Sequence, residues 1–206
     1  MIIASASENK NIEKRVAITP EIAKKYISLG FKVKIQKNYA SHLGIIDDLY
    51  IEQGVEIDQN ISNVYGSAEI IVQLSLPSNE NLSQLSENQC LIGVLDPYTN
   101  KDKINALINK KVNNFSLELL PRITRAQSMD ILSSQANLAG YKAVIESFSQ
   151  FERAIPMMMT AAGTIPAAKV LVVGAGVAGL QAIATAKRLG AVVSATDVRA
   201  ATKEQV

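Results

Sequence analysis

The sequence contains one cysteine, one histidine and no tryptophan. The lone Cys90 cannot form an internal disulfide, and its apolar, strand-like surroundings predict that it packs as a small hydrophobic side chain in a reducing compartment. The lone His42 lies in a loop-like stretch, where we expect no catalytic role. We also expect no metal site, because His and Cys ligands are nearly absent.

A strong charge of either sign is also missing. The formal net charge is +2, from 21 basic and 19 acidic residues that form no long run. This balance gives no electrostatic reason to expect binding to nucleic acid. The N-terminus has neither the basic segment nor the long apolar run of a signal peptide, so we expect a cytoplasmic protein.

One uncharged stretch, residues 170–186, is long enough to resemble a membrane span. Three glycines lie near its start, and the pattern changes from strand-like to helix-like across them. A buried strand followed by a helix explains the stretch better. We therefore expect no direct insertion of this chain into a membrane.

Apolar material for a core is plentiful, since 48% of the 206 residues are hydrophobic. Short β-branched runs alternate with amphipathic stretches over about the first hundred residues, which predicts a βαβ sheet with helices on its faces. The clearest helix runs from Pro20 to Leu29, with Thr19 as N-cap and Gly30 after its end. The strand candidates are residues 31–35, 69–74, 91–95 and 111–115.

A long helix is predicted after Pro121, from Gln127 to Glu152, and we expect it to join two domains. Its predicted buried face follows spacings of three and four and consists of Met129, Leu132, Ala136, Ala139 and Ala143. A second, polar stripe consists of Gln127, Asp130, Ser133, Ser134 and Asn137. Such a stripe faces either water or a polar ligand.

The strongest motif follows residues 169–173, an apolar run that predicts a fully buried parallel strand. The motif is the glycine turn Gly174-Ala175-Gly176-Val177-Ala178-Gly179, and a helix pattern continues to about Leu189. This order is typical of dinucleotide-binding Rossmann units. In such units the first glycine permits the tight turn, the second lets the backbone approach a pyrophosphate, and the third lets helix and strand pack closely. The helix N-terminus then faces the phosphates.

Asp197 ends the next predicted strand, residues 191–196. A carboxylate at this position accepts hydrogen bonds from the ribose hydroxyls of NAD and repels the 2′-phosphate of NADP, so the sequence predicts NAD(H) as the ligand. Arg199 is the one feature that could weaken this preference, because a nearby arginine can accommodate that phosphate. We assign Val198 to the same predicted site, together with Asn137 from the long helix.

The predicted fold class is α/β, with two Rossmann-like parallel-sheet domains, of which the second, NAD-binding domain is truncated after its second strand. We assign residues 1–126 to the first domain, 127–164 to a connecting helix and linker, and 165–206 to the start of the second domain. A doubly wound dinucleotide site draws on about six strands, so the predicted site is incomplete as written.

Several segments resemble one known family. The resemblance is carried by Arg122–Asp130, Ser133–Tyr141, Pro156–Thr164 and residues 170–206, and more weakly by Lys14–Pro20. Together they resemble the alpha subunit, or domain I, of proton-translocating nicotinamide nucleotide transhydrogenase, which shares its fold with alanine dehydrogenase.

The resemblance implies a component of a Re/Si-specific NAD(P)+ transhydrogenase. In that family domain I binds NAD(H) and exchanges a hydride with NADP(H) held by domain III, while proton flow through membrane domain II drives the exchange. Such a chain is a homodimer, peripheral to the inner membrane through its partner domains. Direct hydride transfer needs no acid, base or metal from the chain, which orients the rings and excludes water.

The resemblance also implies roles for four residues. Gln127 contacts the nicotinamide ribose and helps to bring the two rings together. Ser133 and Arg122 hold the carboxamide, and Asp130 pairs with Arg122. These positions agree with the polar stripe of the long helix.

Two alternatives stay open. Alanine dehydrogenase binds and protonates a keto acid with an arginine, a lysine and a histidine of its first domain. Arg15 matches the arginine, but Ser75 and Asp96 stand near the positions of the lysine and the histidine, which argues against this activity. The other alternative is a truncated, non-catalytic remnant that serves as an interaction module.

Overall fold

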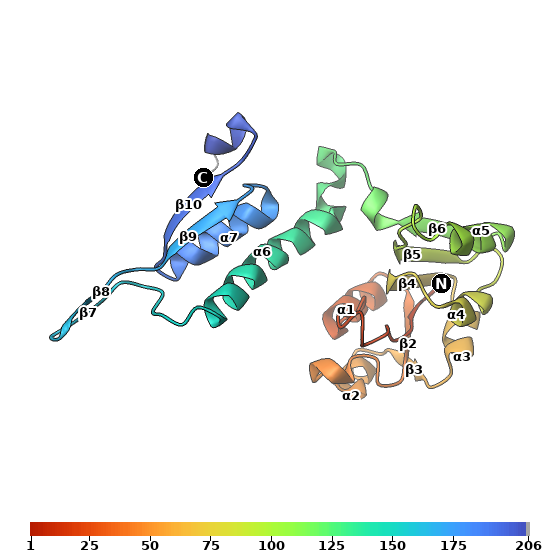
Figure 1. The fold of residues 1–206 in the computed structure, drawn as a ribbon. Helices are drawn as coiled ribbons and strands as arrows, with labels where there is room; N and C mark the ends of the chain where they lie inside the picture. Colours follow the sequence, from red (N-terminus) through yellow and green to blue (C-terminus); the bar gives the residue numbers. More distant parts are fainter. Residues whose placement is uncertain (205–206) are drawn as a thin grey trace. The chain divides into compact units, whose positions relative to one another are not determined.

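The structure is a computed structural model that describes residues 1–204 (Figure 1). Gln205 and Val206, which end the segment of predicted resemblance, lie outside the described residues. The chain divides into two compact units, Met1–Met129 and Asp130–Val206. Within the described residues, no helix is both long enough and apolar enough to cross a membrane.

The first unit contains a parallel sheet of six strands in the order β3-β2-β1-β4-β5-β6. The strands are β1 (Ile2–Ser5), β2 (Lys32–Gln36), β3 (Glu56–Asp58), β4 (Ile70–Ser75), β5 (Cys90–Val94) and β6 (Asn113–Ser116). Strands β2, β4, β5 and β6 confirm the predicted candidates at nearly the same bounds. The sequence pattern does not predict β1 and β3, which are both short.

Helices cover both faces of this sheet, as predicted. They are α1 (Pro20–Ser28), α2 (Asp47–Ile51), α3 (Ile61–Gly66), α4 (Asn79–Ser83) and α5 (Lys101–Asn109). Successive residues of a strand point to opposite faces, so Ala4 packs in a core with α3, α4 and α5, and Ile3 packs in another with α1 and α2. The sheet is therefore doubly wound, which confirms the α/β class.

Helix α1 begins and ends where the sequence predicts. The Thr19 side chain accepts a hydrogen bond from Ile22 N at 3.4 Å, and Pro20 takes the first helical position. Gly30 follows the helix with a φ of +90°, a left-handed conformation that favours glycine. The local cap signals are sufficient to set both ends of this helix.

The second unit holds one βαβ crossover, a long helix and a hairpin. Its elements are α6 (Ile131–Ser149), β7 (Met158–Thr160), β8 (Gly163–Ile165), β9 (Lys169–Val173), α7 (Val177–Arg188) and β10 (Val192–Thr196). Strands β9 and β10 pair in parallel, which confirms the predicted strand, helix and second strand. Strands β7 and β8 form an antiparallel hairpin that extends away from α7 and β9 (Figure 1).

The long helix begins later than predicted, at Ile131 rather than Gln127. Asp130 is its N-cap, and the carboxylate accepts hydrogen bonds from Ser133 N at 3.0 Å and from Ser133 Oγ at 2.6 Å. An N-cap residue has a non-helical backbone, so the α-helix cannot continue through it. The preceding residues Thr124–Met129 form a 3-10 helix instead.

The predicted buried face of α6 is also wrong. Met129 and Leu132 are exposed, and the buried positions are Gly140 and Val144. Helix α7 packs along α6 so closely that a Cβ on Gly140 would lie 2.1 Å from the Ala178 carbonyl oxygen (Figure 1). A glycine therefore sets the contact face, and a pattern of apolar side chains does not reveal it.

Strand β9 is half covered, whereas the sequence pattern predicts full burial. Val170 and Val172 are partly buried on the face that α6 and α7 cover. Leu171 is 66% exposed and Val173 is 79% exposed, so the opposite face lies open in the described residues. An apolar run predicts burial on both faces but does not say which element covers each.

Candidate functional site

The glycine turn connects β9 to α7. Gly174 has a φ of +97°, a conformation that residues with side chains rarely adopt. A Cβ on Gly179 would lie 1.8 Å from the Gly174 carbonyl oxygen, so α7 packs directly on the turn. The tight turn and the close packing predicted for these two glycines are confirmed.

The turn presents backbone N–H groups at the start of α7. Gly176 is the N-cap, and within the described residues no side chain accepts a hydrogen bond at this cap. A Cβ on Gly176 would meet Arg199 Nη2 at 3.9 Å, which is ordinary van der Waals contact. Unused N–H groups and the positive end of a helix dipole suit an anion such as a phosphate. The contact of Gly176, Val177 and Ala178 with a pyrophosphate stays a prediction.

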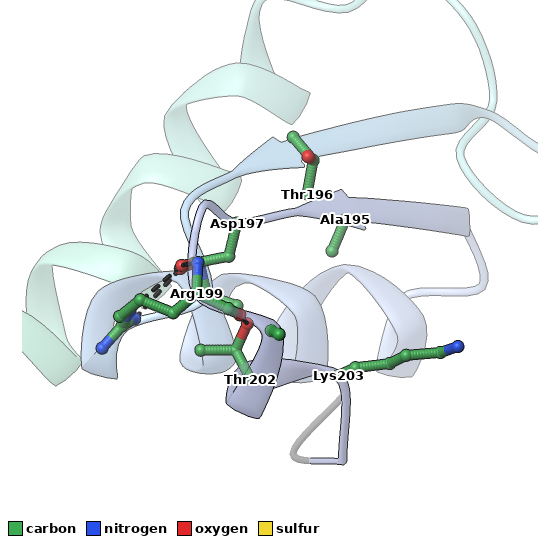
Figure 2. A pocket seen from close by; sticks show the side chains of 8 residues that line it. Ala195, Thr196, Asp197, Arg199, Thr202 and Lys203 are labelled. Atoms are coloured by element: carbon green, nitrogen blue, oxygen red, sulfur yellow. Dashed lines mark hydrogen bonds and ion pairs between the residues drawn. The ribbon is translucent and has the colours of Figure 1, made fainter.

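The Asp197 carboxylate lies at the end of β10, against the glycine turn (Figure 2). Its Oδ2 accepts a hydrogen bond from Ala175 N at 2.7 Å, and its Oδ1 accepts one from Arg199 N at 2.8 Å. The Arg199 guanidinium pairs with both oxygens, Nε with Oδ1 and Nη2 with Oδ2, each at 3.0 Å. These contacts enclose the Asp197 side chain, which is only 7% exposed.

These contacts hold the pKa of Asp197 well below its ordinary value. The Arg199 guanidinium is the largest cause, followed by the backbone N–H groups of Arg199 and Ala175. The same pairing raises the pKa of Arg199. Asp197 is therefore ionised at neutral pH, and Arg199 compensates its charge.

A cavity of about 500 Å³ opens beside this pair (Figure 2). It is lined by Ala175, Ala195, Thr196, Asp197, Arg199, Ala200, Thr202 and Lys203. A second hollow, which Gly174 and Val198 help to line, shares Asp197 with it. Open α/β sheets bind their ligands at the carboxyl ends of the strands, which is where both hollows lie.

The pairing of Asp197 with Arg199 is not predicted from the sequence. A signal was present, because the two residues carry opposite charges and an aspartate carboxylate often accepts a hydrogen bond from the backbone N–H two residues later, as Asp197 does from Arg199 N. From the sequence alone, the Asp197 carboxylate is predicted to accept hydrogen bonds from the ribose hydroxyls. In the structure it already has partners.

The two residues of α6 predicted for the site make hydrogen bonds within the second unit. Asn137 Nδ2 donates to Gln181 Oε1 of α7 at 3.2 Å, and Ser133 donates to its N-cap Asp130. The lining of the cavity beside Asp197 includes neither Asn137 nor Ser133. Their predicted contacts with a cofactor stay predictions.

The four residues expected around the nicotinamide fall in different units. Arg122 and Gln127 belong to the first unit, where Gln127 lies in the 3-10 helix Thr124–Met129. Asp130 and Ser133 belong to the second unit. Their arrangement around one nicotinamide, including the pairing of Arg122 with Asp130, stays a prediction.

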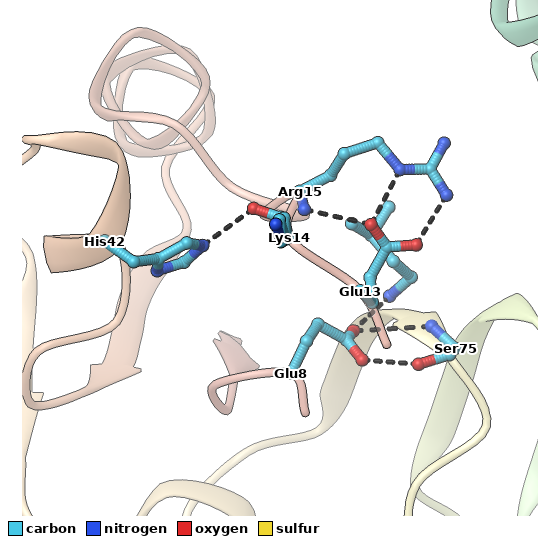
Figure 3. A network of polar contacts seen from close by, with 7 residues as sticks. Glu8, Glu13, Lys14, Arg15, His42 and Ser75 are labelled. Carbon is cyan, nitrogen blue, oxygen red and sulfur yellow. Dashed lines mark hydrogen bonds and ion pairs between the residues drawn. The ribbon is translucent and has the colours of Figure 1, made fainter. Parts of the chain in front are cut away.

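In the first unit, the connection from β1 to α1 has no glycine turn. Glu8 of this connection reaches the end of β4, where its carboxylate accepts hydrogen bonds from Leu74 N at 2.6 Å and from Ser75 Oγ at 2.5 Å (Figure 3). The carboxyl ends of the two neighbouring strands are thus joined by a side chain of the protein itself.

The positions that match alanine dehydrogenase carry other chemistry here. Arg15 is paired with Glu13 through Nη2 and Oε2 at 2.6 Å, and Ser75 is bonded to Glu8 (Figure 3). The imidazole of His42 contacts the Lys14 carbonyl oxygen at 2.7 Å. Neither Ser75 nor Asp96 can supply the amine or the imidazole that keto-acid chemistry needs.

Comparisons with known proteins assign this geometry to a family. Residues 5–139 match the profile described as "Alanine dehydrogenase/PNT, N-terminal domain", and residues 143–206 match the corresponding C-terminal domain. The chain belongs to the alanine dehydrogenase/PNT family. The predicted resemblance is confirmed, and it extends over both units.

Within the alanine dehydrogenase/PNT family, transhydrogenase subunits are more similar to this chain than the alanine dehydrogenases compared. A relative from Rhodospirillum rubrum, named as the first part of NAD(P) transhydrogenase subunit alpha, is 49% identical over the whole chain, which spans 55% of that relative. The alanine dehydrogenase of Methanococcus maripaludis is 29% identical over 96% of the chain, which spans 53% of that relative.

A solved structure gives the same result. The transhydrogenase from Sinorhizobium meliloti superposes with a TM-score of 0.93 at 50% sequence identity, covering 100% of this chain and 61% of that one. The chain thus spans between half and two thirds of the length of these relatives.

Proposed function

We propose that this chain is the NAD(H)-binding component of a proton-translocating transhydrogenase. Hydride would pass between NAD(H) on this chain and NADP(H) on a partner domain. The observation that carries the proposal is the glycine turn between β9 and α7 with Asp197 beside it, in a chain 49% identical to a relative named as a transhydrogenase subunit.

The residues of the second unit fit a dinucleotide. The N-cap Gly176 leaves the first N–H groups of α7 without a side-chain acceptor in the described part of the chain, which suits a pyrophosphate. Asp197 provides a carboxylate for a ribose diol, and the cavity beside it has room for the adenosine half. When bound, NAD(H) supplies or accepts the hydride, and the chain binds and orients it and excludes water.

For the nicotinamide end we propose Arg122, Gln127, Asp130 and Ser133. The hydrogen bond from Ser133 Oγ to Asp130 uses the only hydroxyl proton of Ser133. Ser133 Oγ would therefore accept a hydrogen bond from the carboxamide NH2 group. Arg122 would donate to the carboxamide oxygen, since a guanidinium has donors alone.

The partners we propose are the membrane domain II and the NADP-binding domain III of the transhydrogenase, together with a second copy of this chain. The β7–β8 hairpin supports an interface, because Met158 and Met159 of β7 are 46% and 75% exposed, and the preceding Met157 is 61% exposed. Exposed apolar surface of this kind favours association. Through its association with the membrane domain, the chain would be cytoplasmic and peripheral to the inner membrane.

The experiment is a titration of the purified chain with NADH, followed by nicotinamide fluorescence, for the wild type, Asp197→Ala and Gln127→Ala. We expect saturable binding that Asp197→Ala weakens about tenfold, the effect of losing hydrogen bonds to a charged group. With an added NADP(H)-binding partner domain, Gln127→Ala should slow hydride transfer more than it weakens NADH binding.

The outcomes separate the candidate functions. Saturable binding without hydride transfer to the partner would reduce the function to nucleotide binding. Absence of saturable NADH binding would reject the proposal and favour the non-catalytic interaction module.

A further inference from the structure

The acceptor sites of Asp197 are all in use. An ionised carboxylate offers about four lone-pair sites. Oδ1 accepts from Arg199 N and Nε, and Oδ2 accepts from Ala175 N and Arg199 Nη2. The backbone donors are fixed by the turn, whereas the Arg199 side chain is 60% exposed. A ribose diol therefore competes with the guanidinium, and not with the backbone, for Asp197.

A guanidinium displaced from Asp197 would lie close to the place proposed for the nucleotide phosphates. Its Nη2 is 3.9 Å from the place of a Cβ on Gly176, at the N-terminus of α7. In the described residues, no side chain caps α7 at Gly176, which leaves its first N–H groups for a phosphate. A guanidinium binds phosphate oxygens with two parallel hydrogen bonds, so a nucleotide phosphate can replace the carboxylate as its partner.

The cavity is also less negative than a site with Asp197 as its only charged residue would be. Arg199 compensates Asp197, and Lys203 lines the same cavity. Repulsion between Asp197 and a 2′-phosphate, the basis of selectivity for NAD, is therefore opposed by two cations. The two cations differ in one respect: Arg199 contacts Asp197, whereas the Lys203 side chain extends away from it (Figure 2).

We propose that Arg199 is the residue that determines nucleotide specificity at this site. Its guanidinium masks Asp197 in the free chain and leaves it when a ribose diol binds. It keeps the preference for NAD(H) over NADP(H) smaller than Asp197 alone would impose. The inference rests on the proposed function, because it concerns the same nucleotide site.

The test compares Arg199→Ala with Lys203→Ala. Both variants remove one cation from the same cavity, but only the first unmasks Asp197. Dissociation constants for NADH and for NADPH are measured by nicotinamide fluorescence at one salt concentration. We expect Arg199→Ala to raise the ratio of the NADPH constant to the NADH constant about tenfold, and Lys203→Ala to change it less than about threefold.

A third variant separates charge from masking. Arg199→Lys keeps the cation but lacks the fork that pairs with both carboxylate oxygens. Its ratio should lie between those of the wild type and Arg199→Ala. Arg199→Lys also replaces Arg199→Ala as the test if the alanine variant fails to fold. A ratio of the NADPH constant to the NADH constant equal to that of the wild type would then overturn the proposal.

The remaining outcomes are distinct. An unchanged or lower ratio for Arg199→Ala, with NADH still bound, overturns the inference and leaves the proposed function standing. Failure of NADH to bind the wild type and all three variants rejects the proposed function and the inference together.

Discussion

The two units of this chain both contain a parallel βαβ crossover, but they connect strand and helix differently. In the first unit, the connection from β1 to α1 is tied to β4 by Glu8, which bonds to Leu74 N and Ser75 Oγ. In the second unit, the connection from β9 to α7 is a glycine turn whose helix has no side-chain cap in the described residues. The architecture is shared, and the chemistry of the loop decides which crossover can receive an anion.

The two units also differ in how they are held together. Tyr39 and Tyr50 are buried inside the first unit, where their hydroxyls bond to neighbouring polar groups. The second unit depends on close backbone contacts at Gly140 and Gly179. The stability of the first unit should therefore be most sensitive to the loss of buried polar groups, and that of the second to carbon atoms added at its glycines.

The largest expected effect is that of Gly179→Ala. The new Cβ would lie 1.8 Å from the Gly174 carbonyl oxygen, so α7 must move off the turn, which we expect to destabilise the second unit by about 3 kcal/mol. Hydrogen exchange read separately for the two units should show the change in the second one. Gly66→Ala is the control, because a Cβ there would meet no atom within 4 Å. Wild-type exchange in Gly179→Ala would contradict the close packing.

Tyr39→Phe is expected to act on the first unit alone. The Tyr39 hydroxyl bonds to Ser5 Oγ at 2.7 Å and accepts a hydrogen bond from Ala17 N at 3.0 Å. Its loss leaves the Ala17 and Ile18 N–H groups without this acceptor, at a cost of about 2 kcal/mol, while Ser5 Oγ still donates to Gln73 Oε1. Urea unfolding, followed by hydrogen exchange, measures this loss of stability. Tyr98→Phe is the control, because Tyr98 is exposed. Equal losses in both units would show that they do not unfold independently.

Glu8→Ala tests the closure of the first crossover. Removing the carboxylate leaves Leu74 N–H without its acceptor, which we expect to cost about 1.5 kcal/mol and to speed exchange in the β1–α1 connection. Glu8→Gln, which keeps one acceptor oxygen, should show a smaller change. NADH affinity should stay the same in both variants. A changed affinity would mean that this crossover takes part in nucleotide binding.

The smallest expected effect is a pH dependence at Asp197. Because its pKa is lower in the folded chain than in the unfolded one, its contribution to stability is present above the ordinary aspartate pKa and is lost as the pH falls below it. Exchange of the Ala175 amide should therefore accelerate in acid, below about pH 4. Asp197→Asn should remove this acceleration. If the exchange of the Ala175 amide in Asp197→Asn accelerates in acid as it does in the wild type, another titrating group causes the acceleration.

Local signals predict the second crossover well. The glycine turn and the apolar run place β9 at Lys169–Val173 and the start of α7 at Val177, as observed. Strand β1 is not predicted, because Ile2–Ser5 is short and its place in the sheet depends on β2 and β4, which are distant in sequence. Strand β3 is not predicted either, because it is a short, polar edge strand whose place in the sheet depends on its pairing with β2.

Of the remaining features that the sequence does not predict, one depends on a contact between two helices and the others depend on local side-chain geometry. The buried face of α6 is set where Gly140 meets α7, and the start of α6 is set by its N-cap Asp130. The pairing of Arg199 with Asp197 is a matter of side-chain geometry. Periodicity reports which side chains are apolar, and not which backbones approach each other.

The most direct test of the central claim is backbone amide hydrogen exchange of the chain with and without saturating NADH. The account predicts new protection at Val177 and Ala178 and added protection at Ala175 and Arg199, whose amides already donate to Asp197 in the free chain, with no change at Leu74 and Ser75. Protection at the first crossover in place of the glycine turn, or no change at either crossover, would contradict it.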